Sequence, residues 1–335
     1  MVSGAKALQL SAALQDNVYT RPLIGGRVKA QGVSLTTTVL HGSEMFWRQL
    51  KYAEFDISEM SISSLIIATA RGDRTWAALP IFTMRRFFHT GILVRADAGI
   101  ERPEDLAGKR IGVPEYQQTS AIWSRGVLKD CFGVSPKSVT WFMERGADRS
   151  HGALTGFTPP VGVAINQIPP SSDIGSMLLS GELDGTLLYL NDKNLVDRSR
   201  ANLDAEPLIR RLFKDPVAEA SRYHKQTGLF PMNHLVVVRR SLLEAHPWLA
   251  LNLMSAFTAA KEEVRRDSKE ERLLKAEAGF IDAAASAALD RDLMAYGLSG
   301  ARKELERIAH YVHDQGLCER RVEIDEMLAP NVLDT

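Results

Sequence analysis

With 335 residues, the chain is long enough for about two domains of ~150 residues each, and its 45% hydrophobic and 24% charged residues are typical of globular proteins. Its 41 Lys and Arg side chains balance 41 Asp and Glu side chains, which argues against general nucleic-acid binding. Two cysteines cannot form a disulfide framework, and no apolar run approaches the ~20 residues of a membrane span. We therefore expect a cytoplasmic protein of two domains that binds neither nucleic acid nor a membrane.

In chain order, short strand patterns alternate with helical patterns. The expected strands have apolar residues at alternate positions or in short runs, and they cover residues 8–14, 33–39, 55–57, 76–82, 90–95, 110–116, 139–143, 186–190 and 235–240. The expected helices begin near serine or proline or end at glycine, and they cover residues 43–51, 65–71, 103–108, 119–132, 174–185 and 247–264. Residues 146–170 are expected to form a loop, and the charge run over 261–275 a solvated helical face. The alternation predicts an α/β fold.

The middle of the chain, residues 113–225, has the pattern of one α/β unit inserted into another. The flanking segments, 1–112 and 226–335, would then form one discontinuous domain, and the chain would cross between the two units near Gly112 and Gly228. Two lobes joined in this way leave a cleft between them, and ligands usually bind in such clefts.

Polar residues gather where several of the predicted strands end. Ser61 and Ser63 stand between a strand and a helix, where their hydroxyl groups and the free N–H groups of the helix can hold a carboxylate or simply cap the helix. Thr119 stands at a second helix start and offers the same two roles. Glu115 and Tyr116 come just before it, at the expected crossing between the lobes.

Two histidines stand at further strand ends. His89 follows Arg85 between two apolar strands, and a guanidinium buried there needs an acceptor, either a bound anion or an Asp or Glu from elsewhere in the chain. His234 follows Asn233 just before a buried strand, at the expected return crossing. We expect both histidines to face one cleft between the lobes.

Competing motifs are weak. The chain contains no GxGxxG, GxxxxGK[ST], HExxH or CxxC string. His310 and His313 lie three residues apart on a helical stretch with Cys318 nearby, but the sequence offers no further identifiable metal ligand. We therefore predict no metal site from the sequence.

Six strings carry a resemblance to a known family: FDISEMSISSL, PIFTMRRFFHTGILVR, IGVPEYQQTSAIWSRGVL, LLSGELDG, RLFKDP and TGLFPMNHLVVVRR. Through them the chain resembles the 4,5-dihydroxyphthalate decarboxylase family, which is related in fold to the type II periplasmic substrate-binding proteins. The strings within IGVPEYQQTSAIWSRGVL and TGLFPMNHLVVVRR are the more specific ones. The resemblance covers most of the chain and implies a two-lobe α/β fold of the periplasmic-binding-protein type, with a ligand cleft between the lobes.

The activity that the resemblance implies is decarboxylation of a hydroxylated aromatic acid, such as 4,5-dihydroxyphthalate, without an organic cofactor. Such a reaction needs a proton donor for the ring carbon that bears the carboxylate, a ring hydroxyl that pushes electrons into the ring, and a cationic clamp for a second carboxylate. A dry pocket favours loss of the carboxylate charge. The implied partner is a small aromatic carboxylate, and a homo-oligomer is left open.

Residue type and family position together suggest the site residues. His89, His234 and Glu115 are the catalytic candidates, with one of the two histidines as the proton donor. The candidates for substrate binding are Arg21, Ser61, Ser63, Arg85, Tyr116, Thr119, Arg125 and Asn233.

Two other classes of function stay open at this point. A substrate-binding or sensor protein for an organic anion would use the same arginines and serines and would have no need of the histidines. A different enzyme on the same fold, such as a menaquinone-pathway dehydratase that acts on chorismate-like acids, fits the PEYQ and FPxxH strings less well.

Overall fold

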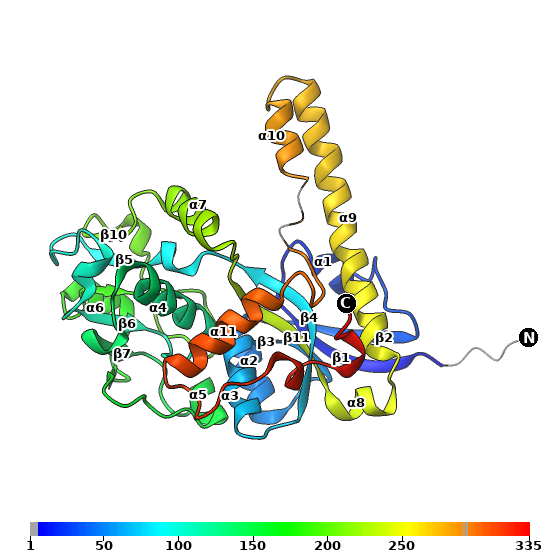
Figure 1. The fold of residues 1–335 in the computed structure, drawn as a ribbon, viewed down its shortest axis with the longest axis horizontal. Coiled ribbons are helices and arrows are strands. Elements are labelled where there is room, and N and C mark those ends of the chain that lie inside the picture. The colour runs from blue at the N-terminus through cyan, green and yellow to red at the C-terminus, as the bar shows by residue number, and fades with distance from the viewer. Residues whose placement is uncertain (1–5, 291, 293) are drawn as a thin grey trace, which may run out of the picture.

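The computed structural model describes residues 6–290, 292 and 294–335 and contains two β-sheets surrounded by helices (Figure 1). The first sheet has the strand order β2-β1-β3-β11-β4. Its strands are β1 (Leu8–Leu14), β2 (Val33–Val39), β3 (Ile57–Ser61), β4 (Trp76–Arg85) and β11 (Met232–Arg239). Strands β1, β2 and β3 run parallel, and β11 lies antiparallel to both β3 and β4. We call the part of the molecule built on this sheet lobe I.

The second sheet has the order β10-β5-β9-β6-β7-β8, and we call the part built on it lobe II. Its strands are β5 (Leu93–Arg95), β6 (Arg110–Val113), β7 (Thr140–Met143), β8 (Ala164–Gln167), β9 (Gly185–Thr186) and β10 (Ile209–Arg211). Strand β6 pairs in parallel with β9 and β7, and β7 pairs in parallel with β8, whereas β5 is antiparallel to both β9 and β10.

Helices cover both sheets and connect most of the strands. The α-helices are α1 (Arg21–Ile24), α2 (Gly42–Tyr52), α3 (Ile62–Ala70), α4 (Thr119–Phe132), α5 (His151–Thr155), α6 (Ile174–Ser180), α7 (Pro216–Thr227), α8 (Arg240–Ala245), α9 (Leu249–Glu277), α10 (Ala283–Ala288) and α11 (Arg302–Asp314). Short 3-10 helices are η1 (Phe88–Gly91), η2 (Pro103–Leu106), η3 (Pro136–Ser138), η4 (Leu203–Ala205), η5 (Ile324–Glu326) and η6 (Pro330–Val332). Helices α9 and α10 project from the body as an arm (Figure 1).

The sheets confirm the predicted two-lobe α/β class, but the chain leaves lobe I earlier than expected. Strands β5 and β6 belong to the second sheet, so the first crossing lies between β4 and β5, before residue 93, and not near Gly112. The pattern misplaced it because strand periodicity identifies a strand and not the sheet to which that strand pairs. The return to lobe I falls between β10 and β11, which spans the expected position near Gly228.

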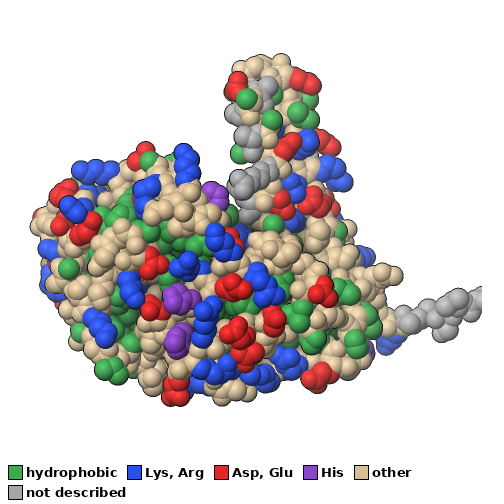
Figure 2. Space-filling view, viewed as in Figure 1, with side chains coloured by type: hydrophobic (Ala, Val, Ile, Leu, Met, Phe, Trp, Pro, Cys, Tyr) green, Lys and Arg blue, Asp and Glu red, His purple; other side chains and the backbone are tan. Residues whose placement is uncertain are grey.

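Most predicted elements are present, and the clearest differences in lobe II concern one strand and one loop. The expected strand over 186–190 is reduced to the two residues of β9, and the expected loop over 146–170 contains α5 and β8. The charge run over 261–275 lies on α9, where most of its side chains are exposed. Lys and Arg alternate with Asp and Glu over the face in Figure 2, as the balanced composition suggests. Within the described part of the chain, no helix combines the length and the apolar character needed to cross a bilayer.

Helix α4 ties the lobes together. The indole Nε1–H of Trp123 donates to the carbonyl oxygen of Met232, at the start of β11, over 2.9 Å. The ring of Tyr311, on α11, lies so close to Gly126 that a Cβ atom there would come within 2.3 Å of it. A glycine is therefore needed at position 126 for this contact.

Candidate functional site

A cavity of about 290 Å³ lies between the two lobes. From lobe I it is lined by residues at the ends of β1, β3, β4 and β11 and at the start of α2; from lobe II, by the start of α4, by α5 and by the segment after β9. The lining residues are Gln15, His41, Gly42, Ser43, Phe46, Ser61, Met84, Arg86, Phe88, Gln118, Thr119, Ser120, His151, Leu188, Leu190, Asp192, Asn233 and His234. The cavity therefore combines three histidines and one arginine with an apolar wall.

His234 is held by a buried carboxylate. Its Nδ1 lies 3.3 Å from Oε2 of Glu59, on the neighbouring strand β3, and Glu59 is fully buried. The side-chain amide of Asn233 donates to Nε2 of His234 over 2.8 Å, so Nδ1 carries the proton that is donated to Glu59. Glu59 also accepts hydrogen bonds from the hydroxyl of Thr83 and the backbone N–H of Gln15. The carboxylate therefore fixes the tautomer and the orientation of the imidazole.

Two further histidines line the cavity in neutral form. Burial lowers the pKa of His151 to about 4, and its Nε2–H donates to the backbone carbonyl of Ser43 over 2.8 Å. Burial likewise lowers the pKa of His41, whose Nδ1 accepts from the N–H of Ser43. The Nε2–H of His41 therefore remains as a donor, 3.8 Å from the carboxylate of Asp192. The ring of Phe46 stands edge-on to both His151 and His234.

A buried ionic cluster supports His151 from behind. The guanidinium of Arg145 donates to Glu115 over 3.0 Å, to Asp197 over 2.8 Å and to the hydroxyl of Ser43 over 2.7 Å. Burial opposes the ionisation of Glu115, but His151 and Arg145 beside it hold the pKa of this carboxyl below its usual range. The cluster joins α2 of lobe I to three segments of lobe II.

Hydroxyl groups join the lobes at the other wall of the cavity. The hydroxyl of Ser61, at the end of β3, lies 2.9 Å from that of Thr119, the first residue of α4. Ser63 donates its backbone N–H to Thr119 and its hydroxyl to the carbonyl of Gln117. Thr119 and Ser61 line the cavity, whereas Ser63 is buried behind them. Their hydroxyls are thus partly used in contacts between the lobes.

Arg86 is the arginine that lines the cavity. Its side chain is exposed, and its guanidinium has no hydrogen-bond or ion-pair partner among the described residues. The preceding residue, Arg85, was one of the expected substrate-binding arginines, but it does not line the cavity. Its guanidinium is buried, lies 3.6 Å from Glu304 and donates to the carbonyl oxygens of Phe230 and Ala295. The sequence analysis considered two acceptors for this guanidinium, a bound anion or an Asp or Glu from elsewhere in the chain. The structure shows the second, Glu304.

His89 also lies outside the cavity lining. It is buried in η1 with its Nε2 3.0 Å from Glu219, on α7, and its ring packs against Phe213 and Tyr223. The structure therefore does not bring the two predicted histidines to one cavity. His89 follows the chain into lobe II, because the crossing between the lobes comes before it.

The other predicted residues divide into those near the cavity and those away from it. Glu115 lies behind His151, within the ionic cluster. Tyr116 is buried under Arg125, whose guanidinium carbon is 3.7 Å from the centre of its ring, and burial lowers the pKa of Arg125 to about 10. Arg125 donates through Nε to Gln315, and neither residue of this stacked pair lines the cavity. Arg21 is exposed and pairs with Asp16.

Sequence reasoning missed several residues that the fold places at the cavity. His41 stands between the end of β2 and the start of α2, a position of the same kind as Ser61 that was overlooked, and His151 lies in the segment 146–170 that was expected to be a loop. Arg145 and Asp197 lie in segments to which the sequence analysis assigned no element. Glu59 lies in the string FDISEMSISSL, two positions before Ser61. A carboxylate in a strand that is expected to be buried needs a hydrogen-bond or ionic partner, and this requirement could have identified Glu59 as a site residue. No group of three or more His, Cys, Asp or Glu side chains is arranged to hold a metal ion in the described part of the chain.

The fold and the cavity define the class of the protein: a two-lobe α/β protein of the periplasmic-binding-protein type. It superposes on the periplasmic aliphatic sulphonate binding protein SsuA from Escherichia coli with a TM-score of 0.57, at 12% identity over 97% of this chain and 92% of that one. A family profile described as NMT1/THI5 like matches residues 58–156.

Two curated relatives identify the family within this class. A 4,5-dihydroxyphthalate decarboxylase of Comamonas testosteroni is 33% identical over 331 residues, which is 98% of both chains. A 4,5-dihydroxyphthalate decarboxylase of Pseudomonas putida is 36% identical over 220 residues, covering 65% of this chain and 82% of that one. The chain belongs to the 4,5-dihydroxyphthalate decarboxylase family.

Proposed function

We propose that the protein is a carboxy-lyase that decarboxylates a hydroxylated aromatic mono- or dicarboxylic acid, such as 4,5-dihydroxyphthalate, in the cavity between the lobes. The observation that carries the proposal is the pair formed by His234 and Glu59 at a cavity that also contains the unpaired Arg86. Two curated relatives of the chain are decarboxylases of this substrate.

The proton transfer is assigned to His234. Glu59 holds the Nδ1–H of the ring, the side-chain amide of Asn233 rotates to release Nε2, and Nε2 then carries the proton that is delivered to the ring carbon bearing the carboxylate. A ring hydroxyl supplies electrons toward that carbon. The bond to the carboxyl carbon then breaks, its electron pair returns to the ring, and CO2 leaves. The proton consumed is restored to His234 from solvent, so one proton is taken up for each CO2 released.

The remaining cavity residues position the substrate. Arg86 offers a bidentate partner to the carboxylate that is retained. The Nε2–H of His41 is a donor to a ring oxygen, and the carboxylate of Asp192 is an acceptor for a ring hydroxyl. Phe46, Phe88 and Leu188 surround the carboxylate that leaves with apolar surface, which favours loss of its charge.

The proposal is tested by CO2 release from a panel of hydroxylated benzoates and phthalates. Replacing His234 by Ala should lower turnover by roughly 10²–10⁴, because a positioned proton donor contributes that much to the rate. Replacing His310, an exposed histidine on α11, by Ala is the matched control and should leave turnover unchanged. Equal turnover of wild type and the His234 variant would remove the assignment.

The alternative is a substrate-binding or sensor protein for an organic anion. It is favoured by one observation, the similarity of the fold to a sulphonate-binding protein. A wild-type protein that binds hydroxyphthalates in calorimetry but releases no CO2 from any member of the panel would favour this alternative over the decarboxylase.

A further inference from the structure

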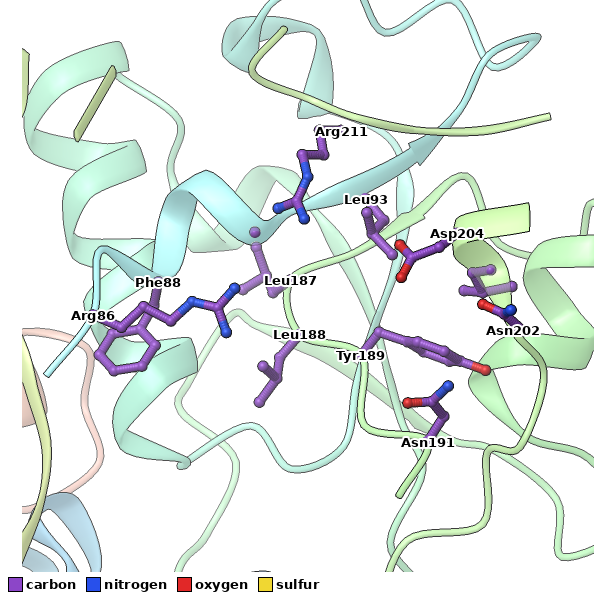
Figure 3. Close-up of a pocket in the computed structure, with 12 residues that line it drawn as sticks. Arg86, Phe88, Leu93, Leu187, Leu188, Tyr189, Asn191, Asn202, Asp204 and Arg211 are labelled. Carbon is purple, nitrogen blue, oxygen red and sulfur yellow. The ribbon is translucent and has the colours of Figure 1, made fainter. Parts of the chain in front are cut away.

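A second pocket, of about 170 Å³, adjoins the cavity between the lobes. The two share Arg86, Phe88 and Leu188 as lining residues, so these three side chains form the wall between them. The rest of the second pocket comes from lobe II. Its further lining residues are Gly91, Leu93, Leu187, Tyr189, Asn191, Asn202, Leu203, Asp204 and Arg211 (Figure 3).

Two arginines give this pocket its positive charge. Arg86 follows β4, and Arg211 is the last residue of β10, so they come from segments far apart in the chain. Figure 3 shows both guanidinium groups directed toward Leu187. Neither guanidinium has a side-chain hydrogen bond or ion pair with any residue that the structure describes. Two unpaired guanidinium groups in one concave site are suited to a carboxylate, which accepts paired hydrogen bonds from each.

The remaining lining selects the kind of carboxylate. Asp204, in η4, presents a carboxylate that has no partner among the described residues, and it can accept a hydrogen bond from a ligand hydroxyl. Tyr189 donates its hydroxyl to the carbonyl of Ala201, which fixes its ring as one wall beside Leu93. Two cations against one anion leave a net positive site, and the volume excludes anything much larger than one substituted ring.

We propose that this second pocket binds a small hydroxylated aromatic carboxylate, with the carboxylate between Arg86 and Arg211 and a ring hydroxyl on Asp204. This inference rests on the proposed function, because a ligand of this kind belongs to the same chemical class as the substrate and as the product of one decarboxylation. Arg86 cannot hold a carboxylate in both pockets at once. Occupancy of the second pocket therefore weakens binding in the first, and the enzyme is inhibited by excess of its own ligand.

The test uses the full chain and 3,4-dihydroxybenzoate as the probe in isothermal calorimetry. Wild type should bind two equivalents, and replacing Arg211 by Ala should weaken the second by about tenfold or more, because charge-assisted hydrogen bonds are lost. Replacing Lys214 by Ala is the matched control: Lys214 is exposed close to Arg211 in the chain, carries the same charge and does not line the pocket. It should leave both equivalents unchanged.

Kinetics provide the second readout. Wild type should lose rate at high substrate, whereas the Arg211→Ala variant should keep its rate there and show the wild-type KM and kcat at low substrate. A variant that binds the probe as wild type does would overturn the second pocket. If the wild-type protein binds two equivalents but releases no CO2, the proposed function is overturned, whereas the second binding pocket is supported.

Discussion

Arg85 and Arg86 differ by one position in the chain and have opposite surroundings. Arg85 ends β4 and points into the protein, where burial lowers its pKa and Glu304 lies close by. Arg86 follows the strand and lines both pockets. Side chains alternate between the two faces of a strand, so of two adjacent arginines at its end one points into the core and the other into the cavity.

The two arginines make a matched pair of variants. Replacing Arg86 by Ala should raise KM by roughly 10–100-fold with a smaller change in kcat, because a clamp binds ground state and transition state alike. Replacing Arg85 by Ala should instead lower the free energy of unfolding by about 3 kcal/mol, since a buried carboxylate loses its cation. Steady-state kinetics and denaturant unfolding of both variants would separate the roles. A rise in KM confined to the Arg85 variant would reverse the assignment.

The residues predicted from the sequence and now found at the cavity share one property: Ser61, Thr119, Asn233 and His234 stand at strand or helix ends that face the other lobe. His89 and Arg85 stand at strand ends too, but their partners Glu219 and Glu304 come from helices more than 100 residues away in the chain. No local pattern reveals such a partner. A polar residue at a strand end is therefore a candidate for the site, and only the tertiary structure shows whether it lines the cavity.

At the scale of elements, the ionic cluster around Arg145 connects α2, α5 and the end of β6 behind the cavity. Helix α5 is only five residues long, and its cap, Ser150, also donates a hydrogen bond to Glu115. The sequence predicted a loop here, because residues 146–170 are rich in glycine and proline and a helix of five residues gives no periodic pattern. Buried charge pairing, and not helical propensity, fixes this element.

The cluster predicts a dependence of stability on pH. His151 takes up a proton near pH 6.5 when unfolded but only near pH 4 when folded, because burial lowers its pKa. The unfolded state therefore binds more protons between these values, and the free energy of unfolding should fall by up to about 3 kcal/mol as the pH drops from 6.5 to 4. Denaturant unfolding across this range measures the slope.

The matched variants for this measurement are His151→Gln and His310→Gln. The first keeps a donor toward the carbonyl of Ser43 but does not titrate, so its slope should be lower than that of wild type by up to one proton. The second changes an exposed histidine and should keep the wild-type slope. Equal slopes for wild type and His151→Gln would contradict the buried neutral histidine.

At the scale of the whole molecule, the sequence predicted two α/β lobes with one inserted into the other. The two sheets confirm the two lobes, and β11 returns the chain to the first sheet after the strands of the second. The position of the first crossing was the error, because β5 pairs with β9 and β10 across more than 90 residues of chain. The cavity follows from the arrangement: the carboxyl ends of β1 and β3 and the start of β11 face α4 across it. Lobes of this kind close over ligands by hinge motion.

A disulfide across the lobes tests whether they must separate. The hydroxyls of Ser61 and Thr119 are 2.9 Å apart, so cysteines at both positions are close enough to bridge. In the oxidised S61C/T119C variant, ligand association followed by stopped flow should slow by about tenfold or more, and reduction should restore it. The S61C variant under the same oxidant is the control for the native Cys131 and Cys318. Full-rate association in the oxidised double variant would argue against a moving lobe.

The position of β11 also sets the order in which the molecule can be completed on the ribosome. β11 lies between β3 and β4, although more than 140 residues separate it from β4 in the chain. The sheet of lobe II is complete once residue 211 has been made, whereas that of lobe I remains divided until residues 232–239 emerge. The nascent chain thus carries open strand edges on β3 and β4 throughout the synthesis of lobe II, and these edges are the segments that a chaperone must protect from pairing with other chains.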